Sequence, residues 1–408
     1  MTKNPGTFGP NNSPISKIIY SAIASWDGFV YQGCCGLCVV LEQILEDREQ
    51  VETQFLNLDE YDDFAILDKD KNILSFHQVK CYKSGKNFEK DMALMEDKRK
   101  WWELKNLCKA DAKLYFHSNM ELNCYHNVEQ YEYTIGEKAL SPTGVVELIG
   151  TLIGKILEQK RWPGNVDTKR DALISLLDKH IALEDNELKK VRGNSSQSPN
   201  KNSIPVANII DILQKSEVKP SVEDRVRTIS FYLNLNLLQR IEDECDGADT
   251  SKVERFLENL NKLQKSEKAN LIKRIFPHFD VFNMNSNIGD MTNQEVANYL
   301  YNILTKTEEM NLDKFHWKTR GQLYSPSTLG KSCSAKMYCG KIVKNRALLP
   351  PELLRDYRWI VGDINETIED IIKSACTINR ISDEDYKNIS KSHKVGLLTI
   401  EDKNNGNI

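Results

Sequence analysis

The feature that most constrains the fold of this chain is a pair of strand-like runs, 61–67 and 73–80, with a charged tetrad between them. The tetrad predicts a tight reversal, so the two runs form an antiparallel hairpin. Because strand side chains alternate between the two faces of a sheet, Gln78 and Lys80 point to the same side. The hairpin brings Asp63, at the start of the first run, beside these two residues. A carboxylate, an amide and an ammonium are therefore expected on one patch.

This combination of groups suits metal-dependent cleavage of a phosphodiester. Asp63 offers a hard anionic oxygen to Mg²⁺ (or Mn²⁺), and the side-chain carbonyl of Gln78 offers a second, neutral oxygen. A bound cation lowers the pKa of a water molecule and offsets charge on the scissile phosphate. Lys80 would orient or deprotonate that water. The alternative interpretation is an ordinary strand end beside an ordinary acidic turn.

The segments around the hairpin predict an α/β domain. Apolar residues recur at helical spacing over 26–46, and a charged helix is expected over 88–109. Strands are expected over 51–58, 112–118 and 128–134. This order of helix, hairpin, helix and strand is typical of an α/β fold.

Beyond residue 140 the pattern becomes helical. Helices are expected over 145–160, 169–182, 206–215, 222–244, 252–273, 293–306 and 352–377. The polar run 191–204 has the composition of a linker. The predicted organisation is a flexible arm (1–14), an α/β domain with trailing helices (15–190), a linker or mobile loop (191–204) and a mostly α-helical domain (205–408).

Composition and charge exclude several classes of protein. The 408 residues carry a net charge of −4, so a general basic coating for nucleic acid is excluded and contact must come from a local patch. The basic, aromatic-rich stretch 80–109 is the candidate patch, and its alternative is a solvated helix face. Its candidate phosphate contacts are Lys83, Lys86, Lys98, Arg99 and Lys100. With no apolar run of membrane-spanning length and no apolar leader, we expect a cytoplasmic chain without a membrane contact.

Two further motifs do not develop into sites. Cys35 and Cys38 have metal-like spacing, but no second ligand pair accompanies them, so we interpret them as buried thiols in a packed helix. The tripeptide Gly330-Lys331-Ser332 lacks the earlier glycine of a phosphate-binding loop, because Ser325 occupies that position. ATP hydrolysis by this chain is therefore not expected.

Four segments of the first 80 residues resemble a known nuclease domain. They are Trp26-Asp27-Gly28-Phe29-Val30-Tyr31-Gln32, Glu52, Asp62-Asp63-Phe64 and His77-Gln78-Val79-Lys80. Together they are similar to the restriction-endonuclease-like (PD-(D/E)xK) domain, in its Gln-x-Lys branch, of bacterial anti-phage effectors such as CBASS endonucleases. The resemblance implies that Asp63, Gln78 and Lys80 are catalytic and that Asp63 and Gln78 hold the metal. The resemblance also implies supporting roles for Gln32, Glu52 and Asp62. The sequence departs from the wider superfamily at Gln78, where an acidic residue is usual.

The helical remainder, with the run 173–183, resembles the ABC-three-component or Lamassu type of defence system. That resemblance implies an SMC-like ABC ATPase subunit and a small third subunit as partners, and double-stranded DNA as substrate. A nuclease with no sequence-reading module must be restrained, so we expect inhibition by partners and activation through release and self-association. The alternatives are a cyclic-oligonucleotide-gated CBASS effector and a non-catalytic scaffold. The apolar helix 226–241 is either central in its domain or a partner-docking surface.

Overall fold

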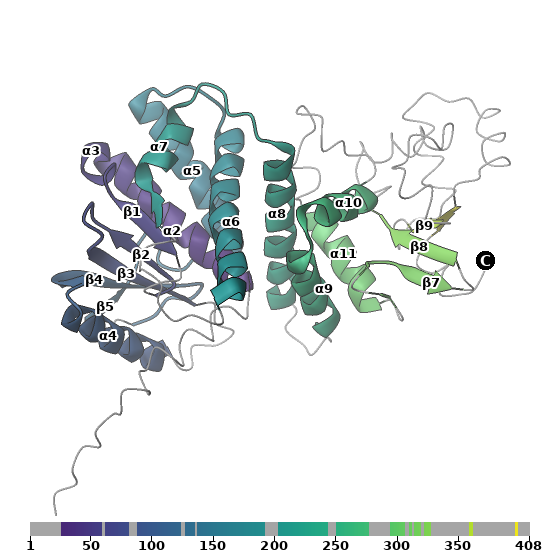
Figure 1. The fold of residues 1–408 in the computed structure, drawn as a ribbon, viewed down its shortest axis with the longest axis horizontal. Coiled ribbons are helices and arrows are strands. Elements are labelled where there is room, and N and C mark those ends of the chain that lie inside the picture. The colour runs from purple at the N-terminus through teal and green to yellow at the C-terminus, as the bar shows by residue number, and fades with distance from the viewer. Residues whose placement is uncertain are drawn as a thin grey trace, which may run out of the picture. The chain divides into compact units, whose positions relative to one another are not determined.

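The computed structural model divides the chain into two compact units, Met1–Val218 and Lys219–Ile408 (Figure 1). The residues that it describes are 26–58, 62–80, 88–123, 127–134, 137–191, 203–243, 250–276, 294–306, 310–311, 314–319, 322–327, 359–361 and 396–398. The expected arm at 1–14 lies outside them. Along the described chain, every helix is too short or too polar to span a bilayer.

The first unit is built on a six-stranded mixed sheet in the order β5-β4-β3-β2-β1-β6. Its strands are β1 (Phe55–Leu58), β2 (Phe64–Leu67), β3 (Ile73–Lys80), β4 (Cys108–Ser118), β5 (Val128–Gln130) and β6 (Ser203–Pro205). The expected hairpin is confirmed: β2 and β3 are antiparallel with Phe64 opposite His77. Strands β3, β4 and β5 run parallel, so their carboxyl ends share one edge of the sheet.

Helices cover both faces of this sheet (Figure 1). Helix α2 (Trp26–Glu46) packs on one face and α5 (Pro142–Lys160) packs on α2. Contact between α2 and the sheet is close at Gly36, where a Cβ atom would lie 2.9 Å from Leu56 and 3.3 Å from Phe64. Helix α4 (Phe88–Leu104) covers the other face and places Met92 and Met95 in its core.

Several helices and strands of this unit begin or end at other residues than expected. Residues 48–51 form the short helix α3, so the strand expected over 51–58 begins only at Phe55. Helix α4 ends at Leu104, before the expected 109, because the chain enters β4 at Cys108. Helix α6 (Val166–Val191) extends beyond 169–182 in both directions.

The division between the units also falls later than the expected linker at 191–204. Residues Ser203–Pro205 form β6, which pairs with β1 as an edge strand of the sheet. Helix α7 (Val206–Gln214) follows and buries its apolar face in the same unit. The Lys169 ammonium donates to the carbonyls of Leu213 and Lys215 at 2.7 Å, and so caps the carboxyl end of α7.

The described residues of the second unit form four helices and a small sheet. The helices are α8 (Val222–Asp243), α9 (Ser251–Lys262), α10 (Lys265–Ile275) and α11 (Gln294–Lys306). The single helix expected over 252–273 is divided because Gln264 and Glu267 form a capping box that starts α10. The sheet has the order β10-β9-β8-β7.

The strands of this sheet interrupt the expected helical region. They are β7 (Trp317–Thr319), β8 (Gln322–Pro326), β9 (Trp359–Val361) and β10 (Gly396–Leu398). Strand β9 falls inside the helix expected over 352–377, and the prediction is wrong at these three residues. Their Trp-Ile-Val sequence combines aromatic and β-branched side chains, which favour a strand. The rest of that expected helix lies outside the described residues.

One face of helix α8 lies in the core of the second unit. Val226, Ile229, Leu233, Leu237 and Ile241 enter the core formed with α9, α10 and α11. All residues from 228 to 237 are buried, including polar ones. The face that lies in this core supports the interpretation of 226–241 as a central helix, and its role as a partner-docking surface stays a prediction.

Candidate functional site

The β2–β3 hairpin brings three of the predicted site residues together. Asp63 lies immediately before β2, and Gln78 and Lys80 lie at the carboxyl end of β3. One oxygen of Asp63, Oδ2, accepts hydrogen bonds of 2.7 Å from Gln78 Nε2 and from the backbone N–H of Val79. The Lys80 ammonium lies 3.9 Å from the same oxygen. The carboxylate, amide and ammonium thus meet at one oxygen atom.

Burial has the largest effect on the pKa of Asp63. It raises the pKa of this carboxyl to about 6, against the opposing effect of the Lys80 ammonium. The neighbouring Asp62 carboxylate adds to the rise in pKa, whereas the Val79 N–H and Lys98 counteract it. The side chain of Lys80 is 38% exposed, so its ammonium can reach a ligand from solvent while it neutralises Asp63.

Asp62 points to a different partner. Its Oδ1 atom lies 2.7 Å from the ammonium of Lys98, which α4 carries. Asp62 Oδ2 is buried and has no hydrogen-bond partner among the residues that the structure describes. The sequence patterns did not reveal this ion pair, because its members lie 36 residues apart and belong to different elements.

Gln32 and Glu52 occupy other positions. Gln32 is buried in α2, one turn before Cys35, and no described residue forms a hydrogen bond with its Oε1 atom. Cys35 lies close enough to Asp63 for the carboxylate to contribute to its raised pKa. Glu52 follows α3, at the end of the β1–β2 ladder opposite to Asp63, since Phe55 pairs with Leu67.

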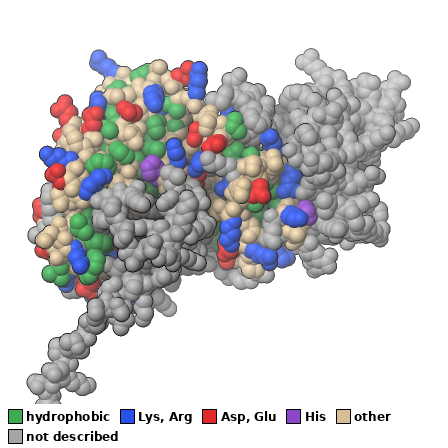
Figure 2. Space-filling view, viewed as in Figure 1, with side chains coloured by type: hydrophobic (Ala, Val, Ile, Leu, Met, Phe, Trp, Pro, Cys, Tyr) green, Lys and Arg blue, Asp and Glu red, His purple; other side chains and the backbone are tan. Residues whose placement is uncertain are grey.

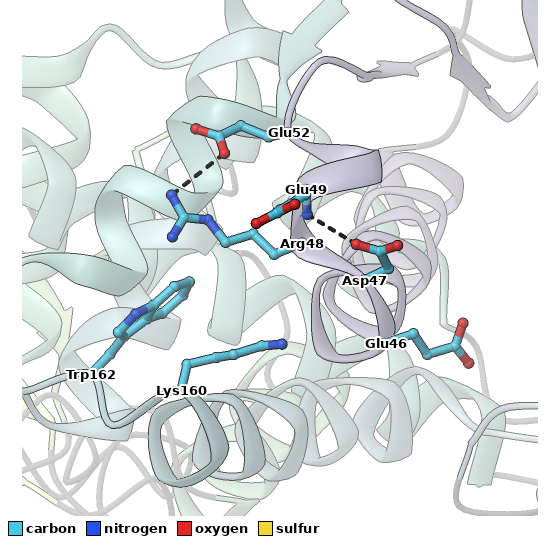
Figure 3. Close-up of a pocket in the computed structure, with 7 residues that line it drawn as sticks. All are labelled: Glu46, Asp47, Arg48, Glu49, Glu52, Lys160 and Trp162. Carbon is cyan, nitrogen blue, oxygen red and sulfur yellow. Dashed lines mark hydrogen bonds and ion pairs between the residues drawn. The ribbon is translucent and has the colours of Figure 1, made fainter.

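Figure 3 shows the open pocket in which Glu52 lies, a cavity of about 560 Å³. Its lining residues are Glu46, Asp47, Arg48, Glu49, Glu52, Lys160 and Trp162. Arg48 forms an ion pair of 3.4 Å with Glu52 and lies over the ring of Trp162. The structure therefore separates Glu52 from the Asp63 cluster, and we do not include it in the candidate site.

The predicted phosphate contacts are largely engaged with acidic neighbours. Lys98 pairs with Asp62, Arg99 lies 3.9 Å from Glu103, and Lys100 lies 3.9 Å from Asp97. Lys83 and Lys86 lie outside the described residues. Figure 2 shows basic and acidic side chains interspersed over the described surface that faces the viewer.

A hydrogen-bonded histidine pair lies beneath the site. His77 Nδ1 and His117 Nε2 are 2.9 Å apart; Ser75 Oγ bonds His77 at 2.8 Å and Tyr133 OH bonds His117 at 2.8 Å. Phe64 stacks on His77 with ring centroids 4.3 Å apart. Burial lowers the pKa of His77 well below its usual range and that of His117 to about 3. Both rings are therefore neutral core groups. Their hydrogen bonds join β3 and β4 to the segment after β5, where Tyr133 lies.

This pair predicts an acid sensitivity of the fold. The unfolded chain takes up a proton at His117 below pH 6.5, whereas the folded chain does not until about pH 3. Stability is therefore lost as the pH falls through this interval, by about 2 kcal/mol at pH 5 from His117 alone. Urea unfolding at pH 7 and pH 5 measures the loss. His117→Phe should be less stable at pH 7 yet lose less on acidification, and equal losses in both proteins would contradict the prediction.

The donors of the site suit a hard cation. Among the described residues, no group of three or more His, Cys, Asp or Glu could hold a metal ion, and Cys34, Cys35 and Cys38 are buried free thiols, as expected. Asp63 with Gln78 supplies carboxylate and amide oxygens, which fit Mg²⁺ or Mn²⁺ better than a softer metal. Within the described part of the chain, the buried Oδ2 of the adjacent Asp62 has no hydrogen-bond partner and adds to this oxygen-rich character. In this structure the amide nitrogen of Gln78 faces Asp63, so ligation through Gln78 requires its amide to rotate.

The fold and site define an α/β protein with a carboxylate–amide–lysine cluster at a strand end, followed by a mostly helical unit. The model of a known family, the C-terminal domain 1 of the ABC-three component (ABC-3C) systems, matches residues 121–363. Since this match covers more than half of the chain, the protein belongs to that family and is a component of such a defence system. Neither the curated proteins nor the solved structures contain a match.

The matched region begins after β4 and excludes all residues of the Asp63 cluster. It does include β5, α5, α6, β6 and α7 of the first unit. The family match therefore covers the last elements of the first unit and most of the second unit, and the Asp63 cluster is assessed from its own geometry. ABC-3C systems have several components, which agrees with the expectation of partner subunits.

Proposed function

We propose that this chain is the Mg²⁺-dependent DNA endonuclease of an ABC-3C anti-phage defence complex, with a restriction-endonuclease-like first unit. The single observation that carries the proposal is the meeting of Gln78, the Val79 N–H and Lys80 at one oxygen of the buried Asp63 carboxylate. Asp63, Gln78 and Lys80 are the trio that the sequence resemblance assigns to the site. The ABC-3C family match favours this context over the cyclic-oligonucleotide-gated alternative.

Each group has a distinct part in the proposed reaction. Asp63 and, after rotation of its amide, Gln78 would hold Mg²⁺, which supplies a water of lowered pKa and offsets charge on the scissile phosphate. The Val79 N–H fixes Asp63 by a 2.7 Å hydrogen bond, so the carboxylate is oriented before the substrate arrives. Lys80 is exposed enough to approach the phosphate, where it would orient the attacking water and stabilise the developing negative charge.

We infer that the other subunits of the complex control the nuclease activity. The proposed partners are an SMC-like ABC ATPase and a small third subunit, which hold the nuclease inactive. Release and self-association would then place two active sites across one duplex, because each site cuts one strand.

Incubation of the purified full-length protein with supercoiled plasmid tests the proposal. Nicked and linear DNA are expected with Mg²⁺ or Mn²⁺ and not with EDTA, and the rate should rise more than linearly with protein concentration if self-association is required. Absence of cleavage at all concentrations, both alone and with the partner subunits, would favour a non-catalytic scaffold. Double-strand cutting by a strict monomer, identified by light scattering, would remove the self-association step.

A further inference from the structure

The ion pair between Lys98 and Asp62 is unusual for its shielding from solvent. The two atoms are 2.7 Å apart, and the exposed fractions of the side chains are 14% for Lys98 and 2% for Asp62. Exposed ion pairs contribute little to the stability of a fold. Loss of one partner from a shielded pair is more costly, because it leaves the other charge buried and uncompensated. Nothing comparable holds for Lys100 on the same helix, whose side chain is 61% exposed and whose pairing with Asp97 is 3.9 Å long.

The packing of α4 fixes the position of Lys98. Met95 lies one turn earlier on the helix, is 1% exposed and belongs to the core with Ala65 and Phe76. Residues three apart on a helix share a face, so Lys98 is directed toward the sheet along with Met95. The Lys98 ammonium is consequently held at the start of β2, where Asp62 and Asp63 lie.

We propose that Lys98 is a positioning residue of the candidate nuclease site. Its ion pair fixes Asp62, and through Asp62 the backbone that enters β2, so that Asp63 is the carboxylate presented to the cation. The ammonium also balances the charge of Asp62, so the adjacent Asp62 and Asp63 carboxylates together with Lys98 carry the net charge of one carboxylate, which Lys80 approaches from the other side. This inference rests on the proposed function and changes the expected role of Lys98 from a DNA contact to a group within the site.

A double-mutant cycle in the full-length protein tests this inference. The variants are Lys98→Met, Asp62→Asn and their combination, with Lys113→Met, which removes an exposed lysine of β4, as the matched control. Mn²⁺ affinity is measured by calorimetry at pH 8, the melting temperature is measured in EDTA, and kcat and KM are measured on plasmid DNA.

The expected signs follow from Coulomb's law. Loss of the Lys98 ammonium leaves the charge of Asp62 uncompensated, so Lys98→Met should bind Mn²⁺ about tenfold more tightly, and Asp62→Asn should bind it about tenfold more weakly. The combined variant should return to within about twofold of the unchanged protein because both charges are removed. Lys98→Met should also lower kcat about tenfold with less than a twofold change in KM. Lys113→Met should change none of these quantities.

Other results would overturn the inference. A rise in KM with unchanged Mn²⁺ affinity would make Lys98 a phosphate contact, and a lower melting temperature alone would make the pair purely structural. If Lys98→Met does not fold, Asp62→Asn and the charge-free combined variant still decide the sign of the Mn²⁺ effect. If the unchanged protein neither binds Mn²⁺ nor cuts DNA, the proposed function fails instead, and the melting temperatures in EDTA still measure the coupling between Lys98 and Asp62.

Discussion

Replacement of Lys80 by Ala is expected to abolish Mg²⁺-dependent DNA cleavage while the protein remains folded. Lys80 is the only member of the trio with substantial exposure, at 38%, and its contact with Asp63 is 3.9 Å long. Its removal therefore costs the fold little. Loss of one preorganised group that stabilises transition-state charge typically costs about 10²–10³ in rate, and loss of a general base adds to this. The expected decrease is about a thousandfold, measured as the initial rate of plasmid nicking.

Lys113→Ala is the matched control for this variant. Lys113 is an exposed lysine on β4, the strand beside β3, so its removal changes the total charge equally without affecting the Asp63 cluster. Asp63→Asn should match the loss in Lys80→Ala and should in addition weaken Mg²⁺ binding in calorimetry. Nicking by Lys80→Ala at a rate close to that of Lys113→Ala would remove Lys80 from the proposed mechanism.

The trio could be predicted because its geometry is local. A hairpin with a polar turn specifies which strand ends meet, and the two-residue period of a strand specifies which side chains share a face. Asp68 confirms the turn, since its carboxylate accepts hydrogen bonds from the backbone N–H groups of Asp70 and Asn72. Gln78 and Lys80 consequently reach Asp63 as the alternation of side chains requires.

The features that escaped prediction depend on packing between distant segments. Lys98 meets Asp62 because α4 packs on the sheet and places Lys98 near the start of β2. No spacing of residues within 88–109 predicts that contact. Strand β6 is three residues long, too short for a periodic signal, and its pairing with β1 joins Asn57 to Ser203 across 146 residues. The linker predicted over 191–204 rested on composition alone. The last two residues of that range, 203 and 204, belong to β6 and pair with β1.

The position of β6 and α7 leads to a prediction about truncated proteins. A fragment that ends at Val218 keeps every described element of the first unit and is expected to fold, whereas a fragment that ends at Pro205 loses α7. Thermal unfolding followed by circular dichroism, together with limited proteolysis, distinguishes the two. If the second unit holds the partners, the longer fragment should also fail to co-purify with the ATPase subunit, although its site residues are unchanged.

The expected difference between these fragments is large. Helix α7 buries four apolar side chains, each no more than 1% exposed: Val206, Ile209, Ile210 and Leu213. Burial of each contributes about 1.5–3 kcal/mol, so loss of the helix removes roughly 6 kcal/mol or more, which is comparable to the whole stability of a typical domain. The shorter fragment also leaves the buried Lys169 ammonium without the carbonyls that it caps. Lys169→Met in the longer fragment isolates this second contribution, and equal stability of the two fragments would show that α7 is not part of the first folding unit.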